Sequence, residues 1–293
     1  MDGIILINKP LNCTSHDVVN KVRKICHTKK VGHCGTLDPL ASGVLVLCIN
    51  KATKALQFIT SEDKEYIATI TLGKATDTYD LEGKITSEKE YQNDLTLKQV
   101  EETLKTFLGK QKQVPPIYSA IKVNGKKLYE YARSGKKVEI EPREIEIFDI
   151  DLISISKDMK EIVYKVWCSK GTYIRSLCED IAERLGTVGF MSGLNRTRVG
   201  DFRIEQAVKI SDVAGDDGVV NRDIIKSKFI SIEEFFKDYK SLNFNDLKIF
   251  KFLNGVMINV NLEDGIYKIY NKDIFIGIGI VKNNRIKRDI IIV

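Results

Sequence analysis

The stretch KKVGHCGTLDPLASGVLVLCI, residues 29–49, holds the loop and the strand around which the rest of the chain is organised. Its last part, GVLVLCI at 43–49, is a continuous apolar run, which predicts a buried strand. The loop before it contains three glycines and the dipeptide Asp38-Pro39. Since a proline biases the preceding residue away from the helical region, we expect Asp38 to lie in an extended loop that leads into this strand.

Outward from this loop, strands and helices follow one another without a regular alternation. The predicted strands lie at 3–9, 43–49, 65–73, 137–155 and 161–168, and the predicted helices lie at 14–26, 96–109 and 171–186. Because strands outnumber helices, we predict an α+β fold with a mixed, largely antiparallel central sheet flanked by helices.

Capping residues and apolar spacing support each helix. Thr14 or Ser15 caps the first, which has Val18, Val22 and Ile25 at helical spacing. Thr96 and Gln99 fit a capping box for the second, with Gly109 as its end. Its apolar face is predicted to consist of Leu97, Val100, Leu104 and Leu108, and that of the third helix of Ile174, Leu177, Cys178, Ile181 and Leu185.

The turn-rich segment VAGDDGVVNRD at 213–223 is the predicted domain boundary. We therefore predict a first domain at 1–212 and a second domain at 226–293. The second contains one short helix around NDLKIFKFLNG and several short strands, a content that is typical of a small β-barrel or sandwich.

The charge is unevenly distributed along the 293 residues, which carry 46 Lys plus Arg, 40 Asp plus Glu and a net charge of +6. Residues 1–60 have a net charge of +5, and residues 226–293 have a net charge of +4. Between them, the island at 109–137 holds eight basic residues and one glutamate, interleaved with tyrosines. Basic groups among aromatic rings suit nucleic acid, although a lysine-rich solvated loop has the same composition.

Other classes of protein are disfavoured by what the sequence lacks. Six cysteines show no C-x-x-C pair, and there is no phosphate-binding glycine loop and no G-x-S-x-G elbow. The N-terminus has no signal-peptide layout, and no apolar stretch approaches the ~18 residues of a membrane span. We therefore expect a cytoplasmic protein with reduced thiols and with no metal, nucleotide or flavin cofactor.

Asp38 is the most unusual charged residue. It is the only acidic residue between Asp17 and Glu62, and seven lysines and arginines surround it in the sequence. A carboxylate beside cations stays ionised, as a nucleophile should. The alternative is a structural turn or cap aspartate, since Asp-Pro turns are common.

Three further residues have both a functional and a structural interpretation. Arg175 opens the helix after the Gly171 turn, where it can hold Asp38 through a bidentate pair or form an i,i+4 pair with Glu179. Tyr66 can stack on a base, transfer a proton or simply pack against its own sheet. His33 can act as a stacking wedge, and most lone histidines have no catalytic role.

At these positions the sequence resembles the bacterial tRNA pseudouridine-55 synthases, the TruB family. The signature loop is GHCGTLDPLASGVL at 32–45, and the likeness covers residues 1 to about 210 in family order. The other matching segments are INKP (7–10), DKEYIATITLG (63–73), TDTYDLEG (76–83), QVPPIYSAIKVNGKKLYEYARSG (113–135), CSKGTYIRSL (168–177) and GLNRTRVGDF (193–202). Residues from about 226 resemble, more weakly, the RNA-binding PUA domain. Cys34 departs from the Thr or Gly that is usual in this loop.

The resemblance implies isomerisation of uridine 55 in the tRNA T-loop to pseudouridine, with no cofactor. It implies that Asp38 is the catalytic aspartate, Tyr66 the tyrosine that stacks on the target base, and Arg175 the partner of Asp38. It also implies roles in substrate binding for His33, Tyr173, Leu194, Lys9, Lys122 and Lys127. The target base must be flipped out of the loop, which costs a few kcal/mol. Whether Asp38 attacks C1′ or removes a ribose proton stays open.

The resemblance also implies that the partner is tRNA. We expect the chain to act on it as a monomer, with no guide RNA and no membrane. One alternative is a non-catalytic RNA-binding or RNA-folding protein, which has no need of Asp38. A second is the guide-RNA-dependent catalytic subunit of box H/ACA particles, whose chains tend to carry extra terminal segments. A third is a metal-dependent nuclease, which needs a cluster of carboxylates.

Overall fold

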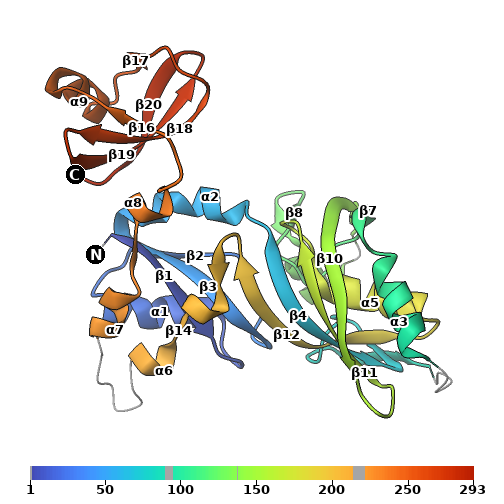
Figure 1. Cartoon of the computed structure of the whole chain (residues 1–293). Helices are drawn as coiled ribbons and strands as arrows, with labels where there is room; N and C mark the ends of the chain where they lie inside the picture. The colour runs from blue at the N-terminus through green and yellow to red at the C-terminus, as the bar shows by residue number, and fades with distance from the viewer. Residues whose placement is uncertain (1, 90–94, 137, 214–221) are drawn as a thin grey trace. The chain divides into compact units, whose positions relative to one another are not determined.

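The computed structural model describes residues 2–89, 95–136, 138–213 and 222–293 (Figure 1). The chain forms two compact units. The first consists of Met1–Asp38, Leu45–Thr60 and Glu205–Val293, and the second of Pro39–Val44 and Ser61–Ile204. The predicted boundary segment at 213–223 lies mostly outside the described residues, so the domain limits 1–212 and 226–293 stay a prediction.

The first unit is built on strand β1 (Gly3–Lys9) and on the later part of β3 (Ala41–Ile49). In the sheet order, β1 lies between β14 (Val208–Lys209), to which it is parallel, and β3. Strands β2 (Val31–Cys34) and β15 (Ile230–Ser231) add antiparallel pairs to β3 and β1. Helix α1 (Ser15–Ile25) packs Val18, Val22 and Ile25 into the core below them. Short helices complete this part: η1 (Asn50–Ala55), α2 (Leu56–Thr60), α6 (Ile210–Val213), α7 (Arg222–Ser227) and α8 (Ile232–Phe235).

The second unit contains a twisted sheet in which β12 (Gly189–Val199) pairs in parallel with the start of β3 and antiparallel with β4 (Lys64–Leu72). The order then continues through β11 (Glu161–Cys168), β10 (Arg143–Ile155) and β7 (Gly109–Gln113), all antiparallel. Helices α3 (Leu97–Lys105) and α5 (Ile174–Arg184) bury their apolar faces in the core of this sheet. The pattern confirms the predicted α+β class with a mixed, largely antiparallel sheet. Smaller elements are β5 (Lys74–Thr76), β6 (Ile85–Glu88), β8 (Lys122–Val123), β9 (Lys126–Lys127), α4 (Leu128–Arg133), β13 (Phe202–Arg203) and η2 (Ile204–Gln206), which continues into the first unit.

Local signals placed the helix starts correctly but one helix end wrongly. Thr14 and Thr96 both form complete capping boxes, the second with Gln99 as predicted. Helix α3, however, ends at Lys105, because a tighter turn through Leu108 leads to Gly109 at φ +90°, where β7 begins. Leu108 is consequently exposed, and Phe107 takes its predicted place in the core. Leu97, the first residue of the helix, is also exposed, so its predicted place on the apolar face was wrong.

The C-terminal part of the first unit is a five-stranded sheet with one helix. Its strand order is β16 (Ser241–Asn243), β18 (Gly265–Asn271), β19 (Ile274–Lys282), β20 (Arg285–Ile291) and β17 (Ile258–Asn259). Helix α9 (Asp246–Leu253) packs Ile249 and Phe252 against it. Asn283 and Asn284, both at positive φ, make the two-residue turn between β19 and β20. This half-barrel sheet agrees with the predicted small β-barrel-like domain, and its identity as a PUA domain stays a prediction.

None of the helices in the described part of the chain is long and apolar enough to cross a membrane.

Gly277 in β19 is the position in this sheet where a side chain fits least. Its φ is +148°, and a Cβ there would overlap the carbonyl oxygen of Ile290 in β20. We expect Gly277→Ala to lower the free energy of unfolding by about 3 kcal/mol, from backbone strain and forced separation of the strands. Urea unfolding, with hydrogen exchange of the β19 amides, measures this change.

Gly265→Ala is the matched control, because its added Cβ would meet nothing closer than a ring carbon of Tyr267 at 3.7 Å in the same sheet. It should change the free energy of unfolding by less than about 0.5 kcal/mol. Equal stability of the two variants would contradict the assignment of strain to Gly277.

Candidate active site

The structure distributes the predicted site residues between the two units. Lys9, His33 and Asp38 belong to the first unit. The second unit carries the remainder: Tyr66, Lys122, Lys127, Tyr173, Arg175 and Leu194.

Asp38 lies half-buried in an irregular loop, and the residue before it is fixed by a serine. The Ser15 hydroxyl accepts the Leu37 N–H at 2.8 Å and donates to the Leu37 carbonyl at 3.0 Å. Ser15 and Leu37 are both buried, so water does not compete for these bonds. The backbone that presents Asp38 is therefore held from the start of α1.

Lys9 is completely buried at the end of β1. Its Nζ donates to the carbonyl oxygens of Pro10 at 2.9 Å and Cys13 at 2.7 Å, which closes the turn before α1. Lys9 thus holds the turn that leads into α1, and its role in substrate binding stays a prediction. His33 lies on β2 opposite Leu47, five residues before Asp38, and is half-buried.

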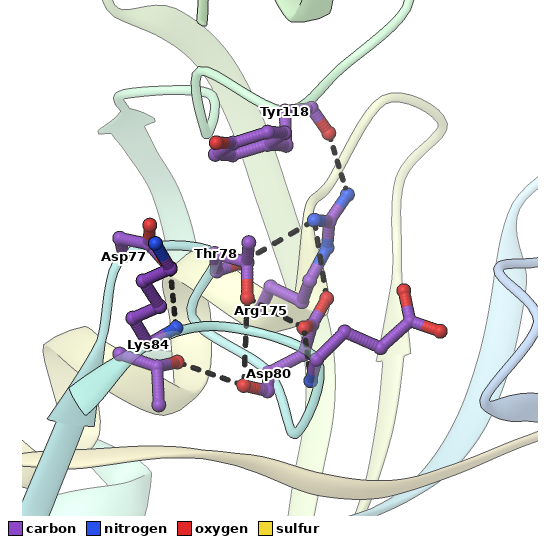
Figure 2. A network of polar contacts seen from close by, with 8 residues as sticks. Asp77, Thr78, Asp80, Lys84, Tyr118 and Arg175 are labelled. Carbon is purple, nitrogen blue, oxygen red and sulfur yellow. Dashed lines mark hydrogen bonds and ion pairs between the residues drawn. The ribbon is translucent and has the colours of Figure 1, made fainter. Parts of the chain in front are cut away.

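The guanidinium of Arg175 lies buried at the centre of a polar network in the second unit (Figure 2). Its Nη1 forms an ion pair with Asp80 Oδ2 at 3.3 Å and donates to the Thr78 carbonyl at 3.3 Å. Its Nη2 donates to the Tyr118 carbonyl at 2.9 Å. Glu179, the alternative partner suggested by helical spacing, accepts a hydrogen bond from the Tyr79 hydroxyl.

Asp80, which was not singled out from the sequence, is also fixed by several hydrogen bonds. Its Oδ1 accepts the Thr78 hydroxyl at 2.6 Å and the Glu82 N–H at 3.0 Å, and its carbonyl accepts the Thr76 hydroxyl at 2.8 Å. The segment TDTYDLEG thus folds into a turn that aims one carboxylate oxygen at Arg175. The only sequence signal for Asp80 was its place in that matching segment.

Tyr66, Leu194 and Ile174 share one hydrophobic cluster. Tyr66 on β4 is 9% exposed, and Leu194 on β12 packs at the margin of the same cluster. Leu194 pairs with Ala41 at the start of β3, three residues after Asp38 in the chain. Tyr173, half-buried, is the N-cap residue of α5, directly before Ile174.

The basic island folds into the β8–β9 hairpin and α4. Lys122 is exposed, whereas the Lys127 Nζ donates to the Tyr129 hydroxyl at 3.2 Å. Arg133 lies 5.5 Å from the centre of the same ring, and the Tyr131 hydroxyl donates to the Val123 carbonyl at 3.0 Å. Two of the island tyrosines therefore order the island itself.

A second basic surface lies on the C-terminal sheet. A cavity of about 730 Å³ there is lined by four cations and one acid, with two apolar side chains and one amide: Lys282, Arg285, Lys287, Arg288, Asp289, Met257, Ile280 and Asn283. Such a combination of cations and apolar groups fits a polyanion that also presents flat apolar faces.

An acidic group on α5 borders the Asp80 turn. The pKa of Glu179 is raised to about 7, chiefly by burial and to a smaller extent by the neighbouring Asp180 and Glu183, against the lowering effect of the Tyr79 hydrogen bond. Burial likewise raises the pKa of Tyr79 to about 12. Within the residues that the structure describes, no group of three or more His, Cys, Asp or Glu side chains is arranged to hold a metal ion.

Comparison with known proteins places this geometry in a known group. A family model described as TruB family pseudouridylate synthase (N terminal domain) matches residues 23–174, and one described as tRNA pseudouridylate synthase B C-terminal domain matches residues 175–224. A tRNA pseudouridine synthase B of Caldanaerobacter subterraneus is 42% identical over 290 residues, with 98% of each chain covered. A tRNA pseudouridine synthase B of Fusobacterium nucleatum is 43% identical over 289 residues, again with 98% of each covered.

Solved structures of the same fold come from box H/ACA particles. A chain in the structure of an H/ACA RNP bound to a substrate RNA containing 2′-deoxyuridine has a TM-score of 0.70 at 22% identity, covering 99% of this chain and 85% of that one. A chain of a Cbf5-Nop10-Gar1 complex has a TM-score of 0.68 at 25% identity, with 99% and 83% covered. At 22% identity the first likeness concerns the fold alone.

The raised pKa of Glu179 predicts a pH-dependent contribution to stability. Folded Glu179 keeps its proton up to about pH 7, whereas the unfolded residue loses it near 4.5. The stability of the wild type relative to Glu179→Gln should therefore be greatest below pH 4.5 and fall as the pH rises through 7. The change should not exceed about 1 to 2 kcal/mol, because the side chain is only partly buried and water screens its charge.

Urea unfolding of both proteins at several values between pH 4.5 and 8 measures this difference. Glu101→Gln, which removes an exposed carboxylate from α3 in the same unit, controls for the loss of one negative charge. A difference between wild type and Glu179→Gln that stays constant over this range would contradict the prediction.

Proposed function

The chain belongs to the TruB family of pseudouridylate synthases, and on this premise we propose that it converts uridine 55 in the T-loop of tRNA to pseudouridine. In this isomerisation the bond between C1′ and N1 breaks, a bond between C1′ and C5 forms, the C5 proton is released to solvent, and N1 takes up a proton. We propose that the chain acts as a monomer without guide RNA. The observation that carries the proposal is the identity of more than 40% with tRNA pseudouridine synthase B over nearly the whole chain.

In this proposal Asp38 is the carboxylate that acts on the ribose, either by attack on C1′ or by removal of a ribose proton. Two observations support this role. Asp38 is the single acidic residue between Asp17 and Glu62, within an otherwise basic segment of the sequence. The Ser15 clamp on Leu37 fixes the backbone that presents Asp38, and a reacting group must be fixed to act efficiently.

Arg175 would pair with Asp38 and orient its carboxylate. A guanidinium has five N–H donors in a planar fork, so it can hold a second carboxylate while it remains bound to Asp80. Asp80 and the Thr78 and Tyr118 carbonyls support this role because they fix the plane of the guanidinium.

Tyr66, Tyr173 and Leu194 would bind the flipped uracil, with Tyr66 stacked on it. The hydrophobic cluster that Tyr66 and Leu194 share supports an apolar pocket, which suits the face of a base. His33 would occupy the space that the base leaves. The exposed Lys122, together with Lys127 and the C-terminal cations, would contact phosphates.

A guide-RNA-dependent subunit is the second candidate, since chains from box H/ACA particles have the same fold. Identity with those chains is 22–25%, against 42–43% with the tRNA pseudouridine synthase B proteins, so we favour action on tRNA without guide RNA.

The proposal predicts that the purified chain releases tritium from C5-labelled uridine in a tRNA transcript, with EDTA present and no guide RNA. Asp38→Asn should reduce this release by about 10³-fold or more, while tRNA binding changes little. Release by wild type and variant is measured under single-turnover conditions, and binding by filter retention.

Asp238→Asn, which removes an exposed carboxylate and changes the net charge equally, is the control and should release tritium at the wild-type rate. No release by the wild type would refute the enzyme activity on tRNA. Equal release by wild type and Asp38→Asn would refute the role of Asp38 alone.

The C-terminal basic cavity predicts a measurable share of tRNA affinity. Replacement of Lys282, Arg285 and Lys287 by Gln should weaken binding and lower the slope of log K against log salt by about 2 to 3, because each phosphate contact releases bound counterions. The rate at saturating tRNA should be unchanged. Filter binding at 50 to 300 mM salt, a range chosen around physiological values, measures the slope.

A triple variant with the same change of charge, in which Lys98, Lys105 and Lys157 become Gln, is the control for a loss of net charge. Equal losses of affinity in the two triple variants would show that the cavity has no particular role.

A further inference from the structure

Helix α5, which carries Arg175, has no capping side chain of its own at its N-terminus. Tyr173 is its N-cap residue, and its side chain makes no capping hydrogen bond. A glutamine from β7 acts in its place: Gln113 Oε1 accepts the Tyr173 N–H at 2.8 Å, and Gln113 Nε2 donates to the Tyr173 carbonyl at 3.1 Å. Gln113 is 4% exposed, so this two-point clamp is shielded from water.

The residues that follow Gln113 hold the rest of the same helical turn. The Ser176 hydroxyl donates to the Val114 carbonyl at 3.0 Å, and Arg175 Nη2 donates to the Tyr118 carbonyl at 2.9 Å. Pro115 and Pro116 lie between these two carbonyls, and their rings restrict the backbone there. The segment 113–118 is therefore joined to residues 173, 175 and 176 by four hydrogen bonds.

Loss of the Gln113 side chain would affect the start of α5 more than its remainder. The Tyr173 carbonyl also accepts the Leu177 N–H at 3.0 Å, so the helix itself would persist. The Tyr173 N–H would lose its capping acceptor, and an uncapped N-terminus frays. Arg175 lies in this first turn, so fraying would change the direction in which its side chain leaves the helix.

We infer that Gln113 is a positioning residue for the reaction, one that fixes the N-cap of α5 and so orients both Tyr173 and Arg175 toward the substrate. The inference rests on the proposed function. Gln113 acts only through these two residues, because its amide is engaged on both sides by the backbone of Tyr173.

The experiment compares Gln113→Ala with Gln111→Ala in the full chain. Gln111 lies on the same strand, and its Nε2 donates to the Phe107 carbonyl at 2.6 Å in a partly buried hydrogen bond. That bond does not involve α5. Gln113→Ala should lower the single-turnover rate of tritium release at saturating tRNA by about 10-fold or more, since small errors of position cost large factors in rate. Its Kd for tRNA should stay within about twofold of the wild type, and Gln111→Ala should retain the wild-type rate.

Several outcomes would decide against the inference. A wild-type rate in Gln113→Ala would overturn it, and so would an equal loss of rate in Gln111→Ala, because that would indicate a general effect of strand packing. If Gln113→Ala does not fold, as judged by circular dichroism, Ser176→Ala tests the same clamp. It should slow the reaction about threefold without a change in Kd, as the loss of one hydrogen bond allows, and a wild-type rate would overturn the inference.

The wild type distinguishes this inference from the proposed function. Inactivity of the wild type on tRNA would refute the proposed function, whereas an active wild type with an equally active Gln113→Ala would refute only the role of Gln113.

Discussion

The second unit is organised around one buried positive charge, the guanidinium of Arg175. Burial of an ion costs several kcal/mol unless it is paired and its remaining donors are bonded. The guanidinium of Arg175 meets this demand with one carboxylate and two carbonyls, from Asp80, Thr78 and Tyr118 (Figure 2). These partners lie 57 to 97 residues away in the chain. The turn at Thr78–Asp80, the segment at Tyr118 and helix α5 must therefore meet at one point, and the sheet strands between them fix where that point lies.

The two central residues of the proposed site are held by the same kind of contact. Leu37, which precedes Asp38, has both backbone groups bonded to the Ser15 hydroxyl. Tyr173, two residues before Arg175, has both backbone groups bonded to the Gln113 amide. In each case a buried polar side chain binds the backbone of a residue close to the functional one in the chain. These bonds do not involve the side chain of Asp38 or Arg175.

Local patterns predicted the parts of the fold that depend on near neighbours in the chain. Thr96 and Gln99 form the predicted capping box, and Ile174, Leu177 and Ile181 form the predicted inner face of α5. Both features depend only on residues a few positions apart in the chain. The end of α3 was wrong, since a tight turn that brings Phe107 into the core overrode the apolar spacing through Leu108. The pair of Asp80 with Arg175 joins residues 95 positions apart, and no local pattern carries such a contact. Asp38 was singled out by the basic residues around it, and Tyr66 and Arg175 by their places in the chain. The catalytic roles of all three came from the resemblance and stay proposals.

The place of Arg175 on its helix explains why it needs a carboxylate partner such as Asp80. Arg175 lies in the first turn of α5, where the helix dipole presents partial positive charge and disfavours a cation. Asp80 compensates the charge of the guanidinium with a carboxylate oxygen at 3.3 Å. A lysine in place of Arg175 would keep the charge but lose the planar fork that reaches Asp80 and the Tyr118 carbonyl together. The geometry of this network, more than its net charge, therefore sets which side chain can occupy position 175.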